Sequence, residues 1–144
     1  MRADEMWRAS GLAGTYEAWA FGDAPDKLAR LVLAGRKKAT ASAYPVYEAT
    51  GAPIPKPGEY SVILDTLGGA VCVIQTIKVD IVPFDRVTQD FARKEGEGDL
   101  SLAYWRQVHA AFFTKEMKSI GKTFDESMPV VCEEFEKVFP RDYD

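Results

Sequence analysis

The sequence predicts a single α+β domain that spans residues 1–144. Short strand-like runs gather around one hairpin signal and are interleaved with separate helices, which is typical of this class. A chain of 144 residues, 47% of them hydrophobic, suits one domain with a substantial core. The sequence contains no glycine-rich dinucleotide motif and no Walker motif, so a doubly wound nucleotide-binding sheet is not indicated. We therefore expect a small β-barrel with helices packed against it.

The opening stretch and the first main helix come first along the chain. The opening stretch carries aromatic residues that we expect to wrap the core because of their large apolar area: Trp7, Tyr16, Trp19 and Phe21. The first main helix is expected over about 24–34, with Asp23 as its N-cap and Pro25 in its first turn. Its apolar residues share one face: Leu28, Leu31 and Val32. Gly35 stands where a left-handed residue ends a helix.

The next segments are a short strand and a proline-rich connection. Hydroxyl residues alternate with small apolar residues in the expected strand: Thr40 and Ser42. The connection, 44–58, holds four prolines, which favour a rigid loop across the barrel mouth over a long regular element: Pro45, Pro53, Pro55 and Pro57. Glu48 lies in this loop, where an exposed position is more typical than one facing a pocket.

A β-hairpin is expected in the middle of the chain. Residues 60–66 alternate as a strand does, and Gly68-Gly69 is a strong turn signal because primed turns need positive φ. The return strand is long, and its alternation predicts one core face: Val71, Val73, Ile77, Val79 and Ile81. The opposite face becomes polar toward its end.

The second half continues with a short helix or turn over 84–94, a helix over about 100–117, and a strand over 130–139. The long helix has an apolar face by its spacing: Leu102, Trp105, His109, Phe112 and Glu116. His109 on such a face is more typical of a hydrogen-bonded core residue than of a catalyst. The charged middle of the last strand suggests an exposed face or a barrel rim: Glu133, Glu134, Glu136 and Lys137.

Charge and composition limit the partners. The net charge is −4 and the pI is near 5.1, which argues against broad binding to a phosphate backbone, so no DNA partner is expected. No apolar run is long enough to cross a membrane, and the charged N-terminus lacks a signal-peptide core; we expect a cytoplasmic protein with no membrane partner. Cys72 and Cys132 are interpreted as buried free thiols. With one histidine in the chain, we expect no metal site and no cofactor.

The junction Gly35-Arg36-Lys37-Lys38-Ala39-Thr40 is the first candidate site. Cations after a helix C-terminus complement the helix dipole and are common on any surface. Lys37, however, projects from a rigid corner between helix and strand, and Thr40 is near enough to share a pocket with it.

An acidic loop, Glu95-Gly96-Glu97-Gly98-Asp99, is the second candidate site. Asp99 could cap the following helix while the glutamates favour its positive end. A calcium loop fails on spacing, because position twelve counted from Glu95 is Arg106. The remaining interpretation is a catalytic carboxylate, because the flanking glycines allow the backbone to approach other groups closely.

These features together resemble the ASCH family, in its longer bacterial branch of stand-alone domains. The Gly35 segment matches the family signature GxKxxT, and the similarity runs from about Tyr16 to Phe139 through matching segments: Trp19-x-Phe21-Gly22-Asp23, Leu33-Ala34-Gly35-Arg36-Lys37, Pro55-x-x-Gly58 and Glu95-Gly96-Glu97-Gly98-Asp99-x-Ser101-Leu102-x-x-Trp105-Arg106. The resemblance implies a PUA-like pseudo-barrel with a cleft beside the signature. It also implies binding of RNA or of a modified nucleoside or nucleotide, because the family includes ribonucleases and amidohydrolases that remove the acetyl group of N4-acetylcytidine.

The resemblance also implies site residues. Lys37 and Thr40 match the catalytic lysine and threonine of the amidohydrolase-like members, and Glu95 fits their glutamate best. Two extra residues and two glycines separate Glu95 from Ser101-Leu102, so Glu97 remains possible. The residues expected to bind the ligand are Arg36, Lys38, Ser42, Glu97 and Arg106.

Several roles and functions stay open. Lys37 could be a base or nucleophile if its pKa is lowered, or a charged group that stabilises an oxyanion. Thr40 could be the nucleophile or position a water, and Glu95 would pass a proton to the leaving group. The leading hypothesis is a hydrolase that needs no metal. The alternatives are a non-catalytic RNA- or nucleotide-binding module, and an adaptor acting through its helix and aromatic N-terminus.

Overall fold

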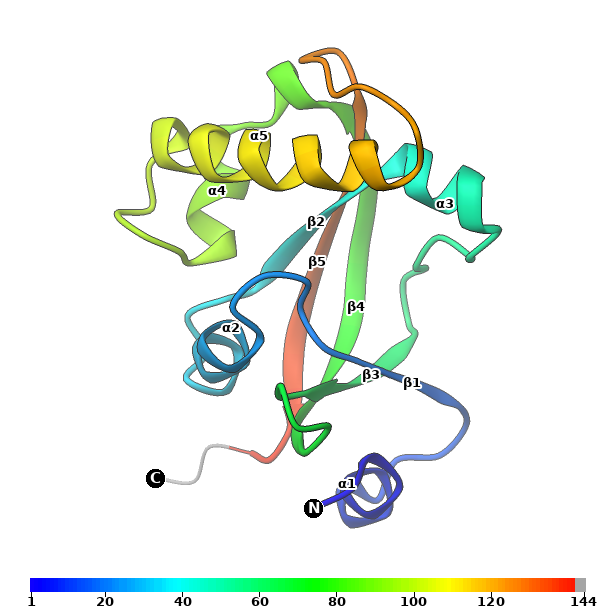
Figure 1. The fold of residues 1–144 in the computed structure, drawn as a ribbon. Helices are drawn as coiled ribbons and strands as arrows, with labels where there is room; N and C mark the ends of the chain where they lie inside the picture. The colour runs from blue at the N-terminus through cyan, green and yellow to red at the C-terminus, as the bar shows by residue number, and fades with distance from the viewer. Residues whose placement is uncertain (142–144) are drawn as a thin grey trace.

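The structure, a computed structural model, describes residues 1–141. One mixed sheet of five strands carries the fold, in the order β1-β3-β4-β5-β2, and helices lie around it (Figure 1). The strands are β1 Tyr16–Trp19, β2 Ala39–Ala43, β3 Tyr60–Leu64, β4 Ala70–Pro83 and β5 Pro129–Phe139. The helices are α1 Ala3–Ser10, α2 Pro25–Leu33, α3 Tyr44–Thr50, α4 Gln89–Glu95 and α5 Leu102–Ser119, with one 3₁₀ turn at Phe84–Arg86.

The sheet is open. β1 pairs in parallel with β3, and the other neighbours are antiparallel. Within residues 1–141 the edge strands β1 and β2 do not pair with each other, so the expected small β-barrel is not confirmed. Both edge strands are short, with four and five residues. The predicted α+β class is confirmed.

The core has three parts that follow the helices. α5 crosses the upper ends of β2, β4 and β5 in Figure 1, and its buried residues pack there with the 3₁₀ turn and α4. α2 packs through Leu28 and Val32 against β3, β4 and Phe135 of β5. α1 covers the other end of β3 and β4 through Met6. The predicted packing role of Trp7 is confirmed, because the centroid of its ring lies 4.9 Å from the centroid of the Tyr16 ring.

The core face of β4 differs from the expectation of simple alternation. Ile77 and Ile81 are 51% and 50% exposed, whereas Thr76 is buried. The pairing of β4 with β5 shifts register between Val73 and Ile74 and again between Thr76 and Lys78. The first shift adds a residue to β5, whereas the second makes Ile77 an extra residue of β4 and turns the β4 side chains after it to the other face. The predicted stripe was therefore wrong beyond Val73.

The helix ends also differ from expectation. Ala24, with φ 42°, is the N-cap residue of α2, and Asp23 does not cap it. Ser101 caps α5 by accepting a hydrogen bond from the Tyr104 N–H at 3.0 Å, while Asp99 accepts one from the Ser101 N–H. The proline-rich connection begins with α3, because Pro45 lies in its first turn, where a missing N–H costs nothing.

Cys72 and Cys132 are buried free thiols, as predicted, and burial raises the pKa of each to about 12. In the described part of the chain, no helix combines the length and apolar character needed to cross a membrane.

Candidate functional site

A cavity of about 370 Å³ lies over the sheet, between the segment leading into α2, the α3 region and α5. Among residues 1–141, five phenylalanine, tyrosine and tryptophan side chains line it: Trp19, Phe21, Tyr47, Tyr60 and Phe112. Ligand sites of proteins usually measure about 300–1,000 Å³ and combine apolar walls with a few polar groups. The cavity therefore has the size and lining of a site for one small molecule.

Lys37 reaches this cavity from the turn after α2. Gly35 ends the helix with φ 77°, and the N–H groups of Arg36 and Lys37 both donate to the Leu31 carbonyl. This turn aims the Lys37 side chain inward, where the residue is 2% exposed. The ring centroid of Phe21 lies 5.3 Å from the Lys37 ammonium. Gly35, which ends the helix, thus also directs the Lys37 side chain into the site.

Lys37 meets both glutamates of the acidic loop. Its Nζ lies 2.8 Å from Glu95 Oε1 and 2.9 Å from Glu97 Oε2. Gly96 between them has φ 72°, and a Cβ there would lie 2.2 Å from the Arg36 carbonyl oxygen. Only glycine allows the two backbones to come this close. The loop consequently brings both candidate carboxylates to the one buried ammonium.

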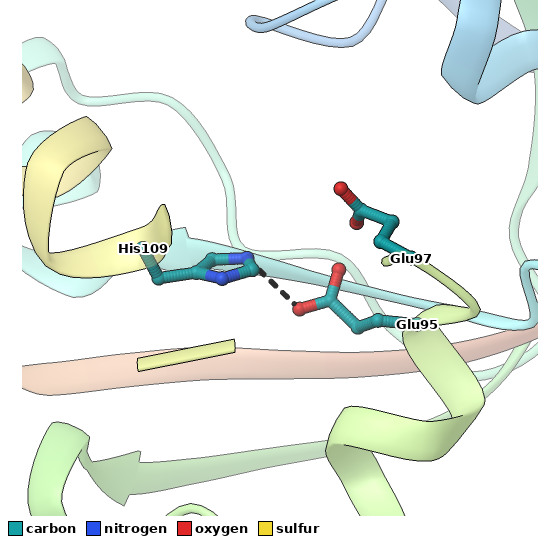
Figure 2. Close-up of side chains that lie close together, drawn as sticks. All are labelled: Glu95, Glu97 and His109. Atoms are coloured by element: carbon teal, nitrogen blue, oxygen red, sulfur yellow. Dashed lines mark ion pairs between the residues drawn. The ribbon is translucent and has the colours of Figure 1, made fainter. Parts of the chain in front are cut away.

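His109 belongs to the same cluster. Its Nε2 lies 3.1 Å from Glu95 Oε2 (Figure 2), and its Nδ1 lies 2.9 Å from the Trp105 carbonyl oxygen. Both partners are acceptors, so both contacts are hydrogen bonds only if both ring nitrogens carry a proton. The geometry therefore favours the imidazolium form. Trp105 completes the arrangement by donating its indole N–H to Glu95 Oε2.

The pKa values follow from these contacts. Burial alone disfavours the charged form of Glu95, but Lys37 and His109 outweigh it and lower the Glu95 pKa to about 2. Burial likewise disfavours charge on Lys37 and His109, and the facing carboxylates outweigh it and raise both pKa values. Glu95 and Lys37 are thus charged at neutral pH, and the raised pKa of His109 favours its imidazolium form. Of the roles left open for Lys37, this arrangement favours a charged group over a neutral base.

Three of these residues also form a donor set of the kind that binds metals. One ligand atom from each of Glu95, Glu97 and His109 lies within 4.8 Å of the others. The Lys37 ammonium, however, donates to both carboxylates. A metal ion bound by these carboxylates would compete with that ammonium.

The remaining residues expected from the sequence divide into two groups. Thr40 and Ser42 line the cavity with Lys37, Glu95 and Glu97. The other three do not line it: Arg36 and Lys38 are exposed, and Arg106 donates to the Asp85 carbonyl at 3.3 Å.

Glu133 is a cavity residue that sequence reasoning missed. The charged middle of β5 indicated an exposed face, but Glu133 is 6% exposed and accepts a hydrogen bond from Thr76 Oγ1 at 2.6 Å. Burial raises its pKa. Glu134, its neighbour, lies on the other face and pairs with Lys94 at 2.8 Å. The apolar residues before Glu133 were a signal of burial, but the alternation could not say which glutamate points inward.

Comparison with known proteins gives a consistent result. A family model described as an ASCH domain matches residues 17–139. The structure of an ASCH domain from Lactobacillus crispatus is similar with a TM-score of 0.88 and 30% identity, covering 94% of this chain and 92% of that one. A protein structure from Enterococcus faecalis is similar with a TM-score of 0.84 and 30% identity, covering 98% and 96%. No curated protein matches the chain. The expected family resemblance and α+β PUA-like fold are confirmed.

Proposed function

We propose, from the premise that this chain belongs to the ASCH domain family, that it hydrolyses an acylated nucleoside of the N4-acetylcytidine type. The observation that carries the proposal is the buried Lys37 ammonium, held between Glu95 and Glu97 in a cavity that Thr40 also lines. A fixed positive charge in a water-poor site stabilises the oxyanion that forms when an amide carbonyl is attacked.

The ammonium has one N–H to offer a substrate. Two of its three N–H groups donate to Glu95 and Glu97, and the nearest acceptor for the third is the Glu95 carbonyl, at a weak 3.4 Å. A substrate carbonyl oxygen in the cavity can take this third bond. The Thr40 hydroxyl, in the same lining, is suited to holding the attacking water.

Glu95 has a different role in this proposal from the proton transfer expected from the sequence. Its carboxylate accepts from Lys37, Trp105 and His109, and its pKa is lowered to about 2. A carboxylate so well satisfied is a poor proton acceptor. It instead keeps Lys37 charged and in place.

The charge of the cavity favours a nucleoside over a nucleotide or RNA. Among the described residues, Lys37 is the one lysine or arginine in the lining, against seven carboxylates: Glu17, Asp23, Glu59, Glu95, Glu97, Glu116 and Glu133. Phosphate binding in proteins uses arginines, lysines or helix N-termini. RNA cleavage and non-catalytic binding of RNA or a nucleotide remain the alternatives.

The test is to incubate the purified protein with N4-acetylcytidine and to measure cytidine by mass spectrometry. Wild type should release cytidine, and Lys37→Met should lose at least about 100-fold of the rate, because one preorganised donor to an oxyanion contributes about that much. Lys27→Met is the matched control, since Lys27 is exposed on α2 and does not line the cavity.

Circular dichroism at the assay temperature keeps misfolding of Lys37→Met apart from loss of catalysis. Absence of cytidine from the folded wild type would rule out the proposed reaction. Short RNA would then be the next substrate to examine.

A further inference from the structure

Glu133 lies beside Thr40 on the cavity face of the sheet. β2 and β5 are antiparallel, and Thr40 is the direct register partner of Glu133. Side chains of directly opposed residues project from the same face, with Cβ atoms about 4.5–5.5 Å apart. Both residues line the cavity, so their polar ends share one space with the ligand.

We propose that Glu133 is the general base of the reaction, accepting a proton from the attacking water that Thr40 holds. This inference rests on the proposed hydrolysis and adds a residue to it. One bridging water is a normal geometry for a base that acts beside a hydroxyl group.

Comparison of the hydrogen-bond partners of Glu95, Glu97 and Glu133 favours Glu133 for this role. Glu95 accepts from three side chains and Glu97 accepts from the Lys37 ammonium. Glu133 accepts from the neutral Thr76 hydroxyl on Oε2. Among residues 1–141, no side chain donates a hydrogen bond to Glu133 Oε1. No fully buried polar side-chain atom in this part of the chain lacks a partner, so Oε1 is not fully buried and is accessible from the cavity.

The surroundings of Glu133 also suit a base. Burial raises its pKa, the Thr76 hydrogen bond lowers it, and the nearby carboxylates of Glu59 and Glu17 raise it further. Tyr47 from α3 lines the same cavity, and its pKa is raised chiefly by burial and further by the charge of Glu133. A carboxylate with a raised pKa holds a proton better than an ordinary glutamate and is a stronger base near neutral pH.

Glu133 both accepts a proton and returns it during the proposed reaction. The water oxygen bonds to the amide carbon while one of its protons moves to Glu133, and the charge on the carbonyl oxygen is held by Lys37. The carbon–nitrogen bond then breaks, its electron pair stays on nitrogen, and the nitrogen takes the proton from Glu133. The products are a carboxylic acid, which ionises in solvent, and the free exocyclic amine.

Glu133→Gln tests the inference, with Glu136→Gln as the matched control on the exposed part of the same strand. With N4-acetylcytidine as substrate, Glu133→Gln should lower kcat by about 100-fold or more, with a much smaller change in KM. Glu136→Gln should match wild type. Wild-type kcat should fall at acid pH with an apparent pKa above the ordinary 4.5 of a glutamic acid, and this decline should vanish in Glu133→Gln.

Thr76→Val provides a second variant. It removes the hydrogen bond that lowers the Glu133 pKa, so the acid decline should move to higher pH. A merely structural role of Glu133 predicts no such movement.

The outcomes separate this inference from the function on which it rests. If wild type releases no cytidine, the proposed function fails and this inference fails with it. If wild type is active and Glu133→Gln keeps both the rate and the acid decline of Glu136→Gln, the base is another group and only this inference is overturned.

Discussion

Glu95 decides the charge state of two other buried residues. Its two carboxylate oxygens separate the roles: Oε1 accepts from Lys37, and Oε2 accepts from His109 and Trp105. Glu95 is 1% exposed, so an unpaired charge at this position would be costly. The oppositely charged partners offset that cost, and each keeps the other ionised. Replacing Glu95 should therefore change the protonation of His109.

Titration of His109 by NMR provides the residue-scale prediction. The chain has one histidine, so one imidazole signal reports this site. In wild type the pKa should lie above 6.5, because the bonds to Glu95 and to the Trp105 carbonyl outweigh burial. In Glu95→Gln the His109 pKa should fall, because burial lowers this pKa and the negative charge of Glu95 no longer raises it. The exposed Glu48→Gln serves as control. A wild-type pKa at or below 6.5 would contradict the imidazolium assignment.

The sign of the linked stability follows from this raised pKa. The stabilisation from protonated His109 is complete below its unfolded pKa and is lost as pH rises through the folded pKa. Glu95 acts in the opposite sense, because its pKa is lowered from 4.5 to about 2. Its contribution is present above pH 4.5 and is lost as the pH falls toward 2.

At the scale of elements, the site depends on the contact of two connections. The turn from α2 to β2 carries Lys37, while Glu95 is the last residue of α4 and Glu97 lies in the loop after it. The backbones touch directly, because the Lys38 N–H donates to the Lys94 carbonyl at 2.7 Å. Gly96 lies at the closest approach. The two ends of the ion pair are thus positioned by backbone packing.

Substitution of Gly96 is the prediction at this scale, with Gly121 as its matched control. Both glycines have φ 72°, but a Cβ at Gly121 meets nothing within 4 Å. Gly121→Ala should lower the free energy of unfolding by about 1 kcal/mol from left-handed strain. Gly96→Ala should lower it by about 1–3 kcal/mol more, because the Arg36 backbone must move.

Chemical denaturation measures both effects, and turnover measures the displacement of Lys37. Gly96→Ala should lose activity, whereas Gly121→Ala should keep it. Equal destabilisation of the two variants would show that the close approach at Gly96 is not held tightly.

At the scale of the whole molecule, the cavity is assembled from nearly every part of the fold. β1, β2, the start of β3, the middle of β4, α5 and β5 each contribute side chains. These elements bring more carboxylates than cations, and Lys37 and His109 already face Glu95 and Glu97. The excess of negative charge is therefore a property of the assembly, and we expect it to disfavour anionic ligands.

Competition between cytidine and its 5′-monophosphate tests this selection. Cytidine should bind at least about tenfold more tightly in calorimetry at low salt, because like charges in one site repel. Added salt should reduce the difference by screening. Equal or tighter binding of the monophosphate would mean that the cavity accepts a phosphate.

Local physics accounts for what could be predicted from the sequence. The apolar spacing of α2 and α5 and the glycine at 35 indicated these helices and the turn that carries Lys37. The hairpin followed from its two glycines, and the family resemblance brought Lys37 together with the acidic loop. The helices, the turn and the hairpin depend on residues a few positions apart, so the sequence carries them directly, whereas only the family resemblance linked Lys37 with the distant acidic loop.

Tertiary structure alone decided the features that depend on pairing between distant segments. The extra residue of β4 at Ile77 left Ile77 and Ile81 exposed, and the register of β2 with β5 placed Glu133 beside Thr40. The protonation of His109 likewise depends on contacts that span α4 and α5. The sequence by itself determined which residues could do chemistry near Lys37. Because a one-residue slip in a strand exchanges its two faces, only the assembled sheet determined which of them face the cavity.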